Sequence, residues 1–547
     1  MKQLWGNTRG LKTAQLKQLG NLYRRRIPPG DLISPELARD MALLSHALGR
    51  QVGLLINRRG KIATVIVGDA QGIVIPALET YRIAPGRLRG LRCVHTHLKN
   101  ESLTNDDLND LALLRLDAMA AITLTKQGHV SRIHWAHILP GSTRRIPCQI
   151  EEALHSHQLS IDCLAVIRAL EQELSQLKST ADTDAGMEQA LLISITSAPR
   201  KLACDSLAEL SELCRTVGIE VAATVLQQSR KTDARFLIGR GKLQEIAIQA
   251  MQHGVGLLIF DQELNPSQIK SIADRIELKV IDRTQLILDI FAQRAQSREG
   301  KLQVELAQLR YLLPRLVAKN TAMSRLTGGI GGRGPGETKL EINRRRVRTR
   351  INRLEKNLRQ VRRQRRQQRR QRERKGVPAI SIIGYTNAGK STLLNTLTKS
   401  RVLAEDRLFA TLDPSSRRLR FPRDVEVIIT DTVGFIHNLP KELVVAFRAT
   451  LEVLAQADVL LHVIDVSNPR HMEQVRSVEL ILADLDLAHI PQVKALNKSD
   501  LLAEAEIRHC KRRLGGVSIC ARDRRSLHPL IQSLDLQIAA FPATANE

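Results

Sequence analysis

A short glycine-rich segment, Gly384-Tyr-Thr-Asn-Ala-Gly-Lys-Ser391, constrains the fold of this chain more than any other feature. It follows Ala379–Gly384, an apolar stretch that predicts a buried strand, and it precedes Thr392-Leu-Leu-Asn-Thr-Leu, which predicts a helix. This is the strand, loop and helix of the GxxxxGK[ST] motif, in which backbone N–H groups and the positive end of the helix hold phosphates. Lys390 supplies a point charge, and the Ser391 hydroxyl suits Mg²⁺. The segment therefore predicts an α/β nucleotide-binding domain.

Two further motifs follow in the order that a guanine-nucleotide site requires. A predicted strand ends in Asp431-Thr-Val-Gly434, where Asp431 can hold Mg²⁺ through water and the Gly434 amide can meet a γ-phosphate. Leu496-Asn-Lys-Ser-Asp500 is an NKxD element, whose Asp500 accepts from N1 and N2 of guanine while Asn497 contacts its other edge. Because adenine lacks the 2-amino group, this carboxylate selects GTP over ATP. The candidate GTP-binding residues are Gly384, Tyr385, Thr386, Asn387, Ala388, Gly389, Lys390, Ser391, Thr392, Asp431, Thr432, Val433, Gly434, Asn497, Lys498 and Asp500, with Lys390 and Gly434 also catalytic.

The net charge points to an anionic partner. The 547 residues, enough for about three to five domains, carry a net charge of +27. Residues 344–375 hold 17 basic and 2 acidic side chains, and residues 1–180 hold 24 and 15. A solvated helix face normally mixes charge signs, so the dense run at 344–375 favours a polyanion over that simpler reading. Aromatic residues are only 3% of the chain, which argues against a fold that stacks single-stranded bases.

Leucine spacing predicts a helical hairpin around the basic run. Val347, Ile351, Leu354, Leu358 and Val361 are spaced 4, 3, 4 and 3 residues apart, as in a coiled-coil seam. The same spacing occurs upstream, at Leu302, Leu306, Leu309, Leu313 and Leu316. Two such helices could pair antiparallel, with the glycine-rich stretch 327–337 at the tip.

The remaining composition favours a cytoplasmic protein. No apolar run approaches the ~18 residues of a membrane span, and Met1–Gly10 lacks the apolar core of a secretory signal. The seven cysteines are scattered and include no CxxC pair, so neither a disulfide framework nor a cysteine zinc site is suggested. Peripheral association with membranes stays open.

From about Met187 onward the chain resembles the HflX family of GTPases, which are related to Obg. The resemblance rests on Thr232–Lys242, Asp282–Ala292, Glu299–Gln308, Gly328–Lys339 and Asp431–Phe435, and it covers about two thirds of the chain. It implies an α/β fold class: a P-loop GTPase domain, a separate α/β domain with an antiparallel helical hairpin, and here an extra N-terminal α/β domain. The expected boundaries are 1–170 for the extra domain, 171–186 for a linker, 187–300 for the α/β domain, 301–375 for the hairpin, 376–530 for the G domain and 531–547 for a C-terminal tail.

The resemblance also implies partners. Such proteins bind the large ribosomal subunit and its rRNA and split stalled or idle ribosomes, with the hairpin tip directed at the peptidyl-transferase region. We expect a monomer that exchanges GTP and GDP. The candidate rRNA contacts are Gly331, Gly332, Arg333, Gly334, Arg362, Arg363, Arg365, Arg366, Arg369 and Arg370.

Several site roles come from the family alone. Phe409, Ala410 and Thr411 match the first switch, with Thr411 as a catalytic residue and Mg²⁺ ligand, and Asn387 matches a K⁺-ligating residue of related GTPases. Phe435 stands where many GTPases carry a water-orienting Gln, which implies slow hydrolysis until a partner or cation completes the site.

The guanine-closing element departs from the family. Cys520 replaces the usual Ser, and Arg524 and Ser526 replace two glycines. The Ala521 N–H is still expected to meet the guanine O6, so Cys520 and Ala521 complete the candidate nucleotide site.

The N-terminal region carries a degenerate zinc pattern. His95-Thr-His97 followed by Asp107 is similar to the HxH…[ST]xxD element of JAMM/MPN metallopeptidases and RadC domains. Two histidines and a carboxylate could hold zinc with one position open. The spacing is one residue short, Leu98 replaces the expected Pro, and Gln51 stands nearest the place of the general-base Glu. A related fold without peptidase activity is therefore favoured over a residual zinc site, and both over an active peptidase.

The sequence thus predicts a Mg²⁺-dependent GTPase that acts on ribosomes. One alternative is an rRNA-binding, hibernation or assembly module in which GTP is mainly a structural ligand, which Phe435 would allow. A weaker alternative is ATP-driven RNA unwinding, against which the NKxD element argues.

Overall fold

In the computed structural model, two compact units are formed by segments that interleave along the chain. Met1–Ala203, Ile219–Ile259 and Ser271–Val280 form one, and Cys204–Gly218, Phe260–Lys270 and Ile281–Glu547 form the other. The structure describes residues 3–76, 78, 81, 87–140, 146–155, 161–182, 188–229, 237–276, 278–316, 339–373, 377–398, 408–409, 415–421, 425–432, 434–436 and 454–539. The expected 187–300 domain is thus divided: much of helix α5 (Arg200–Thr216) and all of helix α8 (Arg283–Arg294) belong to the unit that contains the expected G domain.

A seven-stranded mixed sheet with strand order β1-β3-β2-β4-β5-β6-β7 organises the N-terminal region. Strands β2 and β3 pair antiparallel as a hairpin, while β4 runs parallel to β5. Every residue of β4 is buried, as expected for a central strand. The strands are β1 (Leu4–Gly6), β2 (Val52–Asn57), β3 (Ile62–Val67), β4 (Leu91–His97), β5 (Ala118–Leu124), β6 (Val130–Ile138) and β7 (Cys148–Ile150), and the helices are α1 (Thr13–Asn21), α2 (Pro35–Leu48) and α3 (Asn105–Leu113).

Most of the linker expected at 171–186 is helical. Helix α4 (Cys163–Asp182) continues to Asp182, and its Leu170 and Leu174 pack on the N-terminal core. The Gln, Glu and Lys residues of this stretch are good helix formers, so its polar composition is compatible with a helix.

A second sheet has the order β11-β10-β8-β9. The apolar runs near Ala190 and Gly256 form strands β8 and β10 of this sheet. The strands are β8 (Gln189–Thr196), β9 (Glu220–Gln228), β10 (Leu257–Phe260) and β11 (Lys279–Asp282), and the helices are α5 (Arg200–Thr216), α6 (Arg240–Gln252), α7 (Pro266–Ile276) and α8 (Arg283–Arg294).

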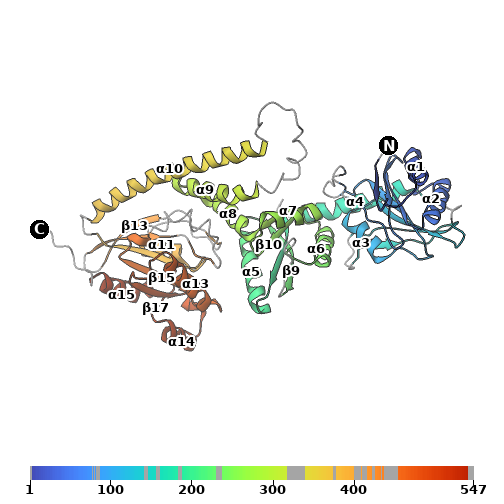
Figure 1. Cartoon of the computed structure of the whole chain (residues 1–547). Helices are drawn as coiled ribbons and strands as arrows, with labels where there is room; N and C mark the ends of the chain where they lie inside the picture. The colour runs from blue at the N-terminus through green and yellow to red at the C-terminus, as the bar shows by residue number, and fades with distance from the viewer. Residues whose placement is uncertain are drawn as a thin grey trace, which may run out of the picture. The chain divides into compact units, whose positions relative to one another are not determined.

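The predicted pairing of two long helices is confirmed. Helix α9 (Arg298–Arg315) packs on α10 (Lys339–Glu373) through a buried cluster that includes Leu306, Ile351 and Leu354. In Figure 1 the two helices lie side by side. The glycine-rich stretch 327–337 lies outside the described residues.

The G domain is a six-stranded sheet of order β13-β14-β12-β15-β16-β17, parallel except for β13. The 531–547 tail is partly wrong as an expectation, because α15 buries Leu534 and Ile538 in the core of this domain. The strands are β12 (Ala379–Gly384), β13 (Ser415–Arg420), β14 (Glu426–Asp431), β15 (Val459–Asp465), β16 (Gln492–Asn497) and β17 (Val517–Ser518), and the helices are α11 (Lys390–Thr398), α13 (His471–Asp484), α14 (Glu504–Leu514) and α15 (His528–Ala539).

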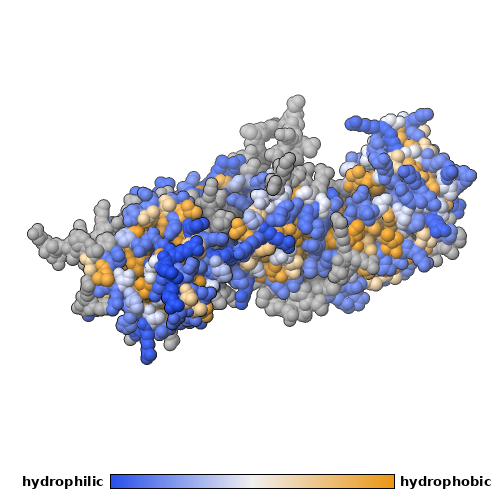
Figure 2. All heavy atoms as spheres, turned by 90° about the horizontal axis from the view of Figure 1, so that it is seen from below, coloured by the Kyte–Doolittle hydropathy of each residue, from blue (hydrophilic) through white to orange (hydrophobic). Residues whose placement is uncertain are grey.

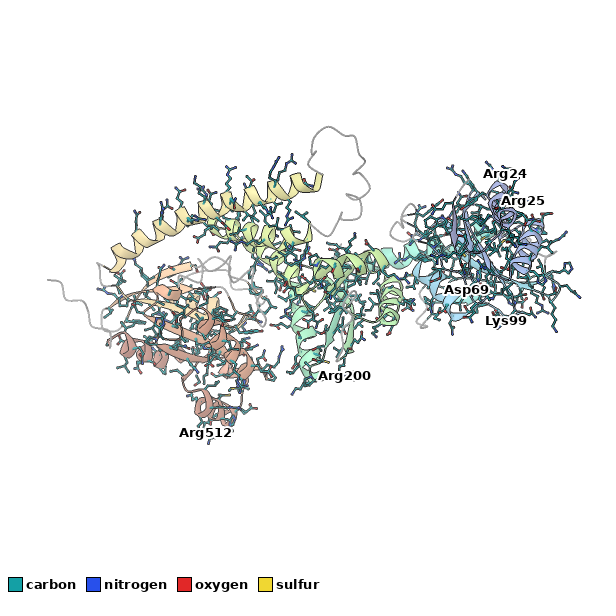
Figure 3. The ribbon with its side chains drawn as sticks, in the orientation of Figure 1. Arg24, Arg25, Asp69, Lys99, Arg200 and Arg512 are labelled. Atoms are coloured by element: carbon teal, nitrogen blue, oxygen red, sulfur yellow. The ribbon has the colours of Figure 1, made fainter. Side chains whose placement is uncertain are left out.

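The face of the molecule drawn in Figure 2 carries both hydrophilic and hydrophobic residues. Figure 3 shows Arg24, Arg25 and Lys99 on the outside of the N-terminal unit. Among the described helices, none has the length and apolar character needed to cross a membrane.

Candidate functional site

The phosphate-binding loop is formed where β12 ends and α11 begins. Gly384 has φ of +148°, and a Cβ there would lie 2.3 Å from the Val463 carbonyl oxygen. Gly389 has φ of +93°, and a Cβ there would lie 2.3 Å from Asn497 Nδ2. Both positions therefore need glycine, which is why the motif keeps it there. The loop closes against β15 on one side and against the NKxD element on the other.

Lys390 and Ser391, the candidates for binding phosphate and Mg²⁺, both form hydrogen bonds within the protein. Lys390 Nζ donates to the Tyr385 carbonyl at 2.7 Å, and Ser391 Oγ donates to Asp431 Oδ2 at 2.6 Å. Burial lowers the pKa of the Lys390 ammonium to about 8, although nearby Asp431 acts in the opposite direction. The serine hydroxyl and the aspartate at the end of β14, 40 residues apart, thus meet where a hard cation would find oxygen ligands.

The Asp-Thr-Val-Gly segment lies directly against the loop. A Cβ on Gly434 would come within 2.9 Å of Lys390 Nζ and of the Thr386 side chain, so the backbone approaches the lysine closely. Thr386 N donates to the Phe435 carbonyl at 2.8 Å. The Phe435 side chain is 2% exposed and packs with Ile383, so it points into a hydrophobic cluster.

The base-recognition elements converge on the same loop. Asn497 Nδ2 donates to the Ala388 carbonyl at 2.8 Å, and its Oδ1 accepts from Ala521 N at 2.8 Å. The amide that we expected to meet guanine O6 is therefore bonded to Asn497 here. Asp500 is exposed. Ser526, which stands where a glycine was expected, donates to the Cys520 carbonyl at 2.8 Å and accepts from Cys520 N at 2.9 Å, so this departure stabilises the closing loop.

Sequence reasoning missed one charged contact at this site. Asp465, the last residue of β15, forms a 2.7 Å ion pair with Lys498 of the NKxD element. The sequence does contain a signal for this ion pair, because Asp465 ends the strand that pairs with the strand before the NKxD element. Of the predicted residues, Ala410, Thr411 and Val433 lie outside the described residues, whereas Phe409 is described and buried.

The basic helix α10 is held to α9 by ion pairs near its first half. Arg350 contacts Glu305 at 2.6 Å and Arg310 contacts Glu355 at 2.6 Å. Arg363 is exposed. The hairpin-tip candidates Gly331, Gly332, Arg333 and Gly334, and the side chains of Arg362, Arg365, Arg366, Arg369 and Arg370, lie outside the described residues.

The three predicted zinc ligands of the N-terminal region converge. His95 and His97 at the end of β4 and Asp107 in the first turn of α3 offer ligand atoms that all lie within 4.8 Å of one another. The His95 and His97 Nε2 atoms are 2.9 Å apart, and His95 Nε2 is 3.2 Å from Asp107 Oδ1. His97 Nδ1 lies 3.0 Å from the Glu101 carbonyl, which directs its Nε2 into the cluster. Thr104 caps α3 and fixes Asp107, whose Oδ2 accepts from Thr104 N at 2.7 Å.

Gln51 is buried in the same sheet as this cluster. It is 1% exposed, and among the described residues neither atom of its side-chain amide has a hydrogen-bond partner. Gly53 pairs with His95 across β2 and β4, so the residue two earlier stands opposite His97. Residues opposite one another in an antiparallel pair share a face of the sheet. Gln51 and the two histidines therefore lie on the same face.

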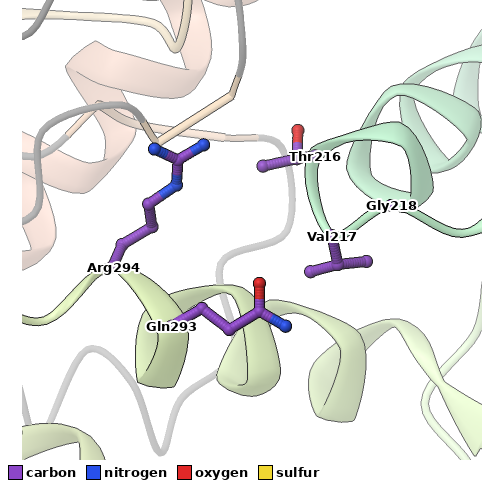
Figure 4. Close-up of a pocket in the computed structure, with 5 residues that line it drawn as sticks. All are labelled: Thr216, Val217, Gly218, Gln293 and Arg294. Atoms are coloured by element: carbon purple, nitrogen blue, oxygen red, sulfur yellow. The ribbon is translucent and has the colours of Figure 1, made fainter.

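A pocket of about 370 Å³ lies elsewhere, at the ends of α5 and α8. It is lined by Thr216, Val217, Gly218, Gln293 and Arg294 (Figure 4). Since none of the nucleotide motifs lines it, it is separate from the phosphate-binding loop.

Comparison with known proteins identifies the family. Family models match as the N-terminal region of GTP-binding GTPases at residues 204–292, their middle region at 294–372, and a 50S ribosome-binding GTPase at 379–498. The chain is 48% identical to the GTPase HflX of Caldanaerobacter subterraneus over 58% of this chain and 73% of that protein, and 46% identical to the GTPase HflX of Escherichia coli over 59% and 76%. A GDP complex of a GTP-binding protein from Sulfolobus solfataricus matches 65% of this chain and 99% of that one, at 24% identity with a TM-score of 0.37. At these identities over more than two thirds of the relatives' length, the chain belongs to the HflX family of GTPases.

Proposed function

We propose that this protein binds the large ribosomal subunit in its GTP state, dissociates stalled or idle ribosomes, and leaves after hydrolysis. The observation that carries the proposal is helix α10, whose basic run begins in the seam with α9 and continues along the chain toward the G domain. One-signed charge of this density favours binding to phosphates. The match of residues 379–498 to a model described as a 50S ribosome-binding GTPase supports the large subunit as the partner.

Residues of this chain would bind and orient GTP as follows. Backbone amides of the loop at 384–391 and the Lys390 ammonium hold the phosphates, and Asp500 reads the guanine edge. Ser391 and Asp431, which already meet at 2.6 Å, would hold Mg²⁺ together with Thr411. Mg²⁺ neutralises charge on the phosphates when it is bound. Asn387 would ligate K⁺, and its φ of +61° places it at a turn of the loop.

The burial of Phe435 implies slow intrinsic turnover. A hydrophobic side chain packed with Ile383 cannot orient a water molecule, so hydrolysis needs a group from a partner or a cation. We therefore propose that ribosomes stimulate turnover, and that the protein acts in the cytoplasm as a monomer.

The test is GTP turnover of the full chain with and without large subunits, together with sedimentation of 70S ribosomes. Stimulation and GTP-dependent separation of subunits support the proposal. GTP-dependent binding without stimulation or separation would favour the alternative, a module that uses GTP as a structural ligand. Turnover of ATP in place of GTP would favour the alternative of ATP-driven RNA unwinding.

We also propose that the N-terminal domain has a JAMM/MPN-like fold and holds one zinc ion without peptidase activity. His95, His97 and Asp107 fit the ion, because two imidazoles and a carboxylate converge in a buried place. Zinc would supply a Lewis acid, but Gln51 offers an amide where such enzymes carry a carboxylate base, and an amide cannot take a proton from water. Zinc titration of the full chain, followed by calorimetry, should give one site that is lost in His95→Ala and retained in His129→Ala, an exterior histidine of the same domain. Equal zinc binding by both variants would exclude the site.

A further inference from the structure

A buried ion cluster joins helices α5 and α8. Arg283, the first residue of α8, donates to Glu209 of α5 at 2.8 Å and to Asp261 at 2.9 Å. Ser206, also on α5, donates to Asp261 at 2.8 Å. All three charged residues are at most 8% exposed, so two carboxylates share one guanidinium away from water. A buried excess of negative charge requires further hydrogen-bond donors.

Tyr385 of the phosphate-binding loop supplies one of these donors. Its hydroxyl donates to Glu209 Oε1, whereas Arg283 donates to Glu209 Oε2, and the tyrosine is 8% exposed. The carbonyl of Tyr385 is the group to which Lys390 donates, and its backbone forms a bridge with Phe435 of the Asp-Thr-Val-Gly-Phe segment. One residue therefore links α5, Lys390 of the phosphate-binding loop and the Asp-Thr-Val-Gly-Phe segment.

Two further contacts join the same helices to the G domain. The ring of Phe291 on α8 meets the ring of Phe409 edge-on, with centroids 4.7 Å apart. Arg470 donates to the Asp205 carbonyl of α5 at 3.2 Å. Phe409 begins the first switch segment, so α8 contacts a second part of the nucleotide site.

We propose that Glu209 is a positioning residue for the GTP site, acting through Tyr385. Its carboxylate holds the Tyr385 ring, and with it the carbonyl that orients Lys390. Because Glu209 is tied through Arg283 to α8, any ligand that moves α5 or α8 changes nucleotide affinity, and nucleotide changes the affinity for that ligand by the same factor. The inference rests on GTP binding at this site and not on ribosome splitting.

A double-mutant cycle on the full chain, without ribosomes, tests the link. Glu209→Gln, Tyr385→Phe and the pair are compared in dissociation of a fluorescent GDP and in kcat and KM for GTP. We expect each single change to speed GDP dissociation about 5–20-fold, which is the lower part of the range of typical coupling free energies. The double variant should be no worse than the stronger single one. Glu212→Gln is the matched control, since Glu212 lies on the same helix, is 54% exposed and pairs with Arg215.

Two outcomes would overturn the inference: unchanged GDP dissociation in Tyr385→Phe, or additive effects in the cycle. Tyr385→Phe removes one oxygen and keeps the ring, so it decides the matter even if Glu209→Gln does not fold. Phe291→Leu, measured in the same GDP dissociation assay, tests the contact between Phe291 and Phe409. GTP turnover that ribosomes fail to stimulate would count against the proposed function while leaving this cycle interpretable.

Discussion

The nucleotide site and the histidine cluster have the same local architecture, but the backbone constrains the residues of the first site and not those of the second. Each lies where a parallel strand ends and a helix begins, β12 with α11 and β4 with α3. In the nucleotide site the backbone decides the residues, because Gly384 and Gly389 leave no room for a Cβ. In the histidine cluster the side chains alone determine the chemistry. Gln51 in the place of the general-base Glu therefore alters that chemistry without altering the fold. Backbone-specified sites are therefore easier to recognise in a sequence.

Removing the Lys390 ammonium should separate the two sites most clearly. Lys390→Ala takes away the buried cation that faces the phosphates, and we expect GTP turnover to fall about 10²–10³-fold, as when one preorganised donor is lost from an active site. Zinc binding should stay unchanged. Turnover in steady state and zinc stoichiometry check both parts, and turnover within about twofold of the parent would mean that Lys390 does not serve the phosphates.

Raising the pH should weaken GTP binding through the same lysine. The pKa of Lys390 is lowered by burial from 10.5 to about 8, so the unfolded chain binds more protons than the folded one between those values. The nucleotide-free protein should therefore gain stability as pH rises through that window. GTP needs the charged form, so its dissociation constant should rise about tenfold between pH 7 and pH 9. Calorimetric titration at constant Mg²⁺ measures this, and an affinity that stays flat to pH 9 would place the pKa higher.

The sequence predicted the elements of the fold better than their grouping. The strands β2, β3, β8, β10 and β12 follow from apolar runs, and the α9–α10 seam from leucine spacing. The division of the 187–300 domain between two units, and the link from Glu209 to Tyr385 across 176 residues, could not be predicted, because no local pattern marks a contact between distant surfaces. The end of the chain differs from the expected tail because Leu530, Leu534 and Ile538 of α15 pack in the core of the G domain, a contact between distant segments that no local pattern marks.

Weakening the cap of α3 should affect only the histidine cluster. The Thr104 hydroxyl accepts from Asp107 N at 3.2 Å and donates to Asp107 Oδ2 at 2.7 Å. Thr104→Val should lower stability by about 1 kcal/mol, the typical value of an N-cap. Zinc affinity should fall with it because Asp107 loses its orientation. Asp106→Asn, exposed in the same turn, is the control, and equal losses in both variants would mean that the cap does not position the ligand.

The smallest expected effect is that of removing the Arg363 charge, which lies on α10 outside both sites. Arg363 is exposed on α10 beyond the ion pairs with α9, so Arg363→Gln should leave GTP turnover and zinc binding intact. If this side chain contacts an rRNA phosphate, the slope of log affinity for the large subunit against log salt should fall by about 0.7–0.9. Arg350→Gln is a useful contrast, because Arg350 already pairs with Glu305 at 2.6 Å and has less charge to offer a phosphate. Binding measured between 50 and 200 mM salt, the range over which phosphate contacts show most clearly, tests this. An unchanged slope for Arg363→Gln would return this part of α10 to the role of a solvated helix face.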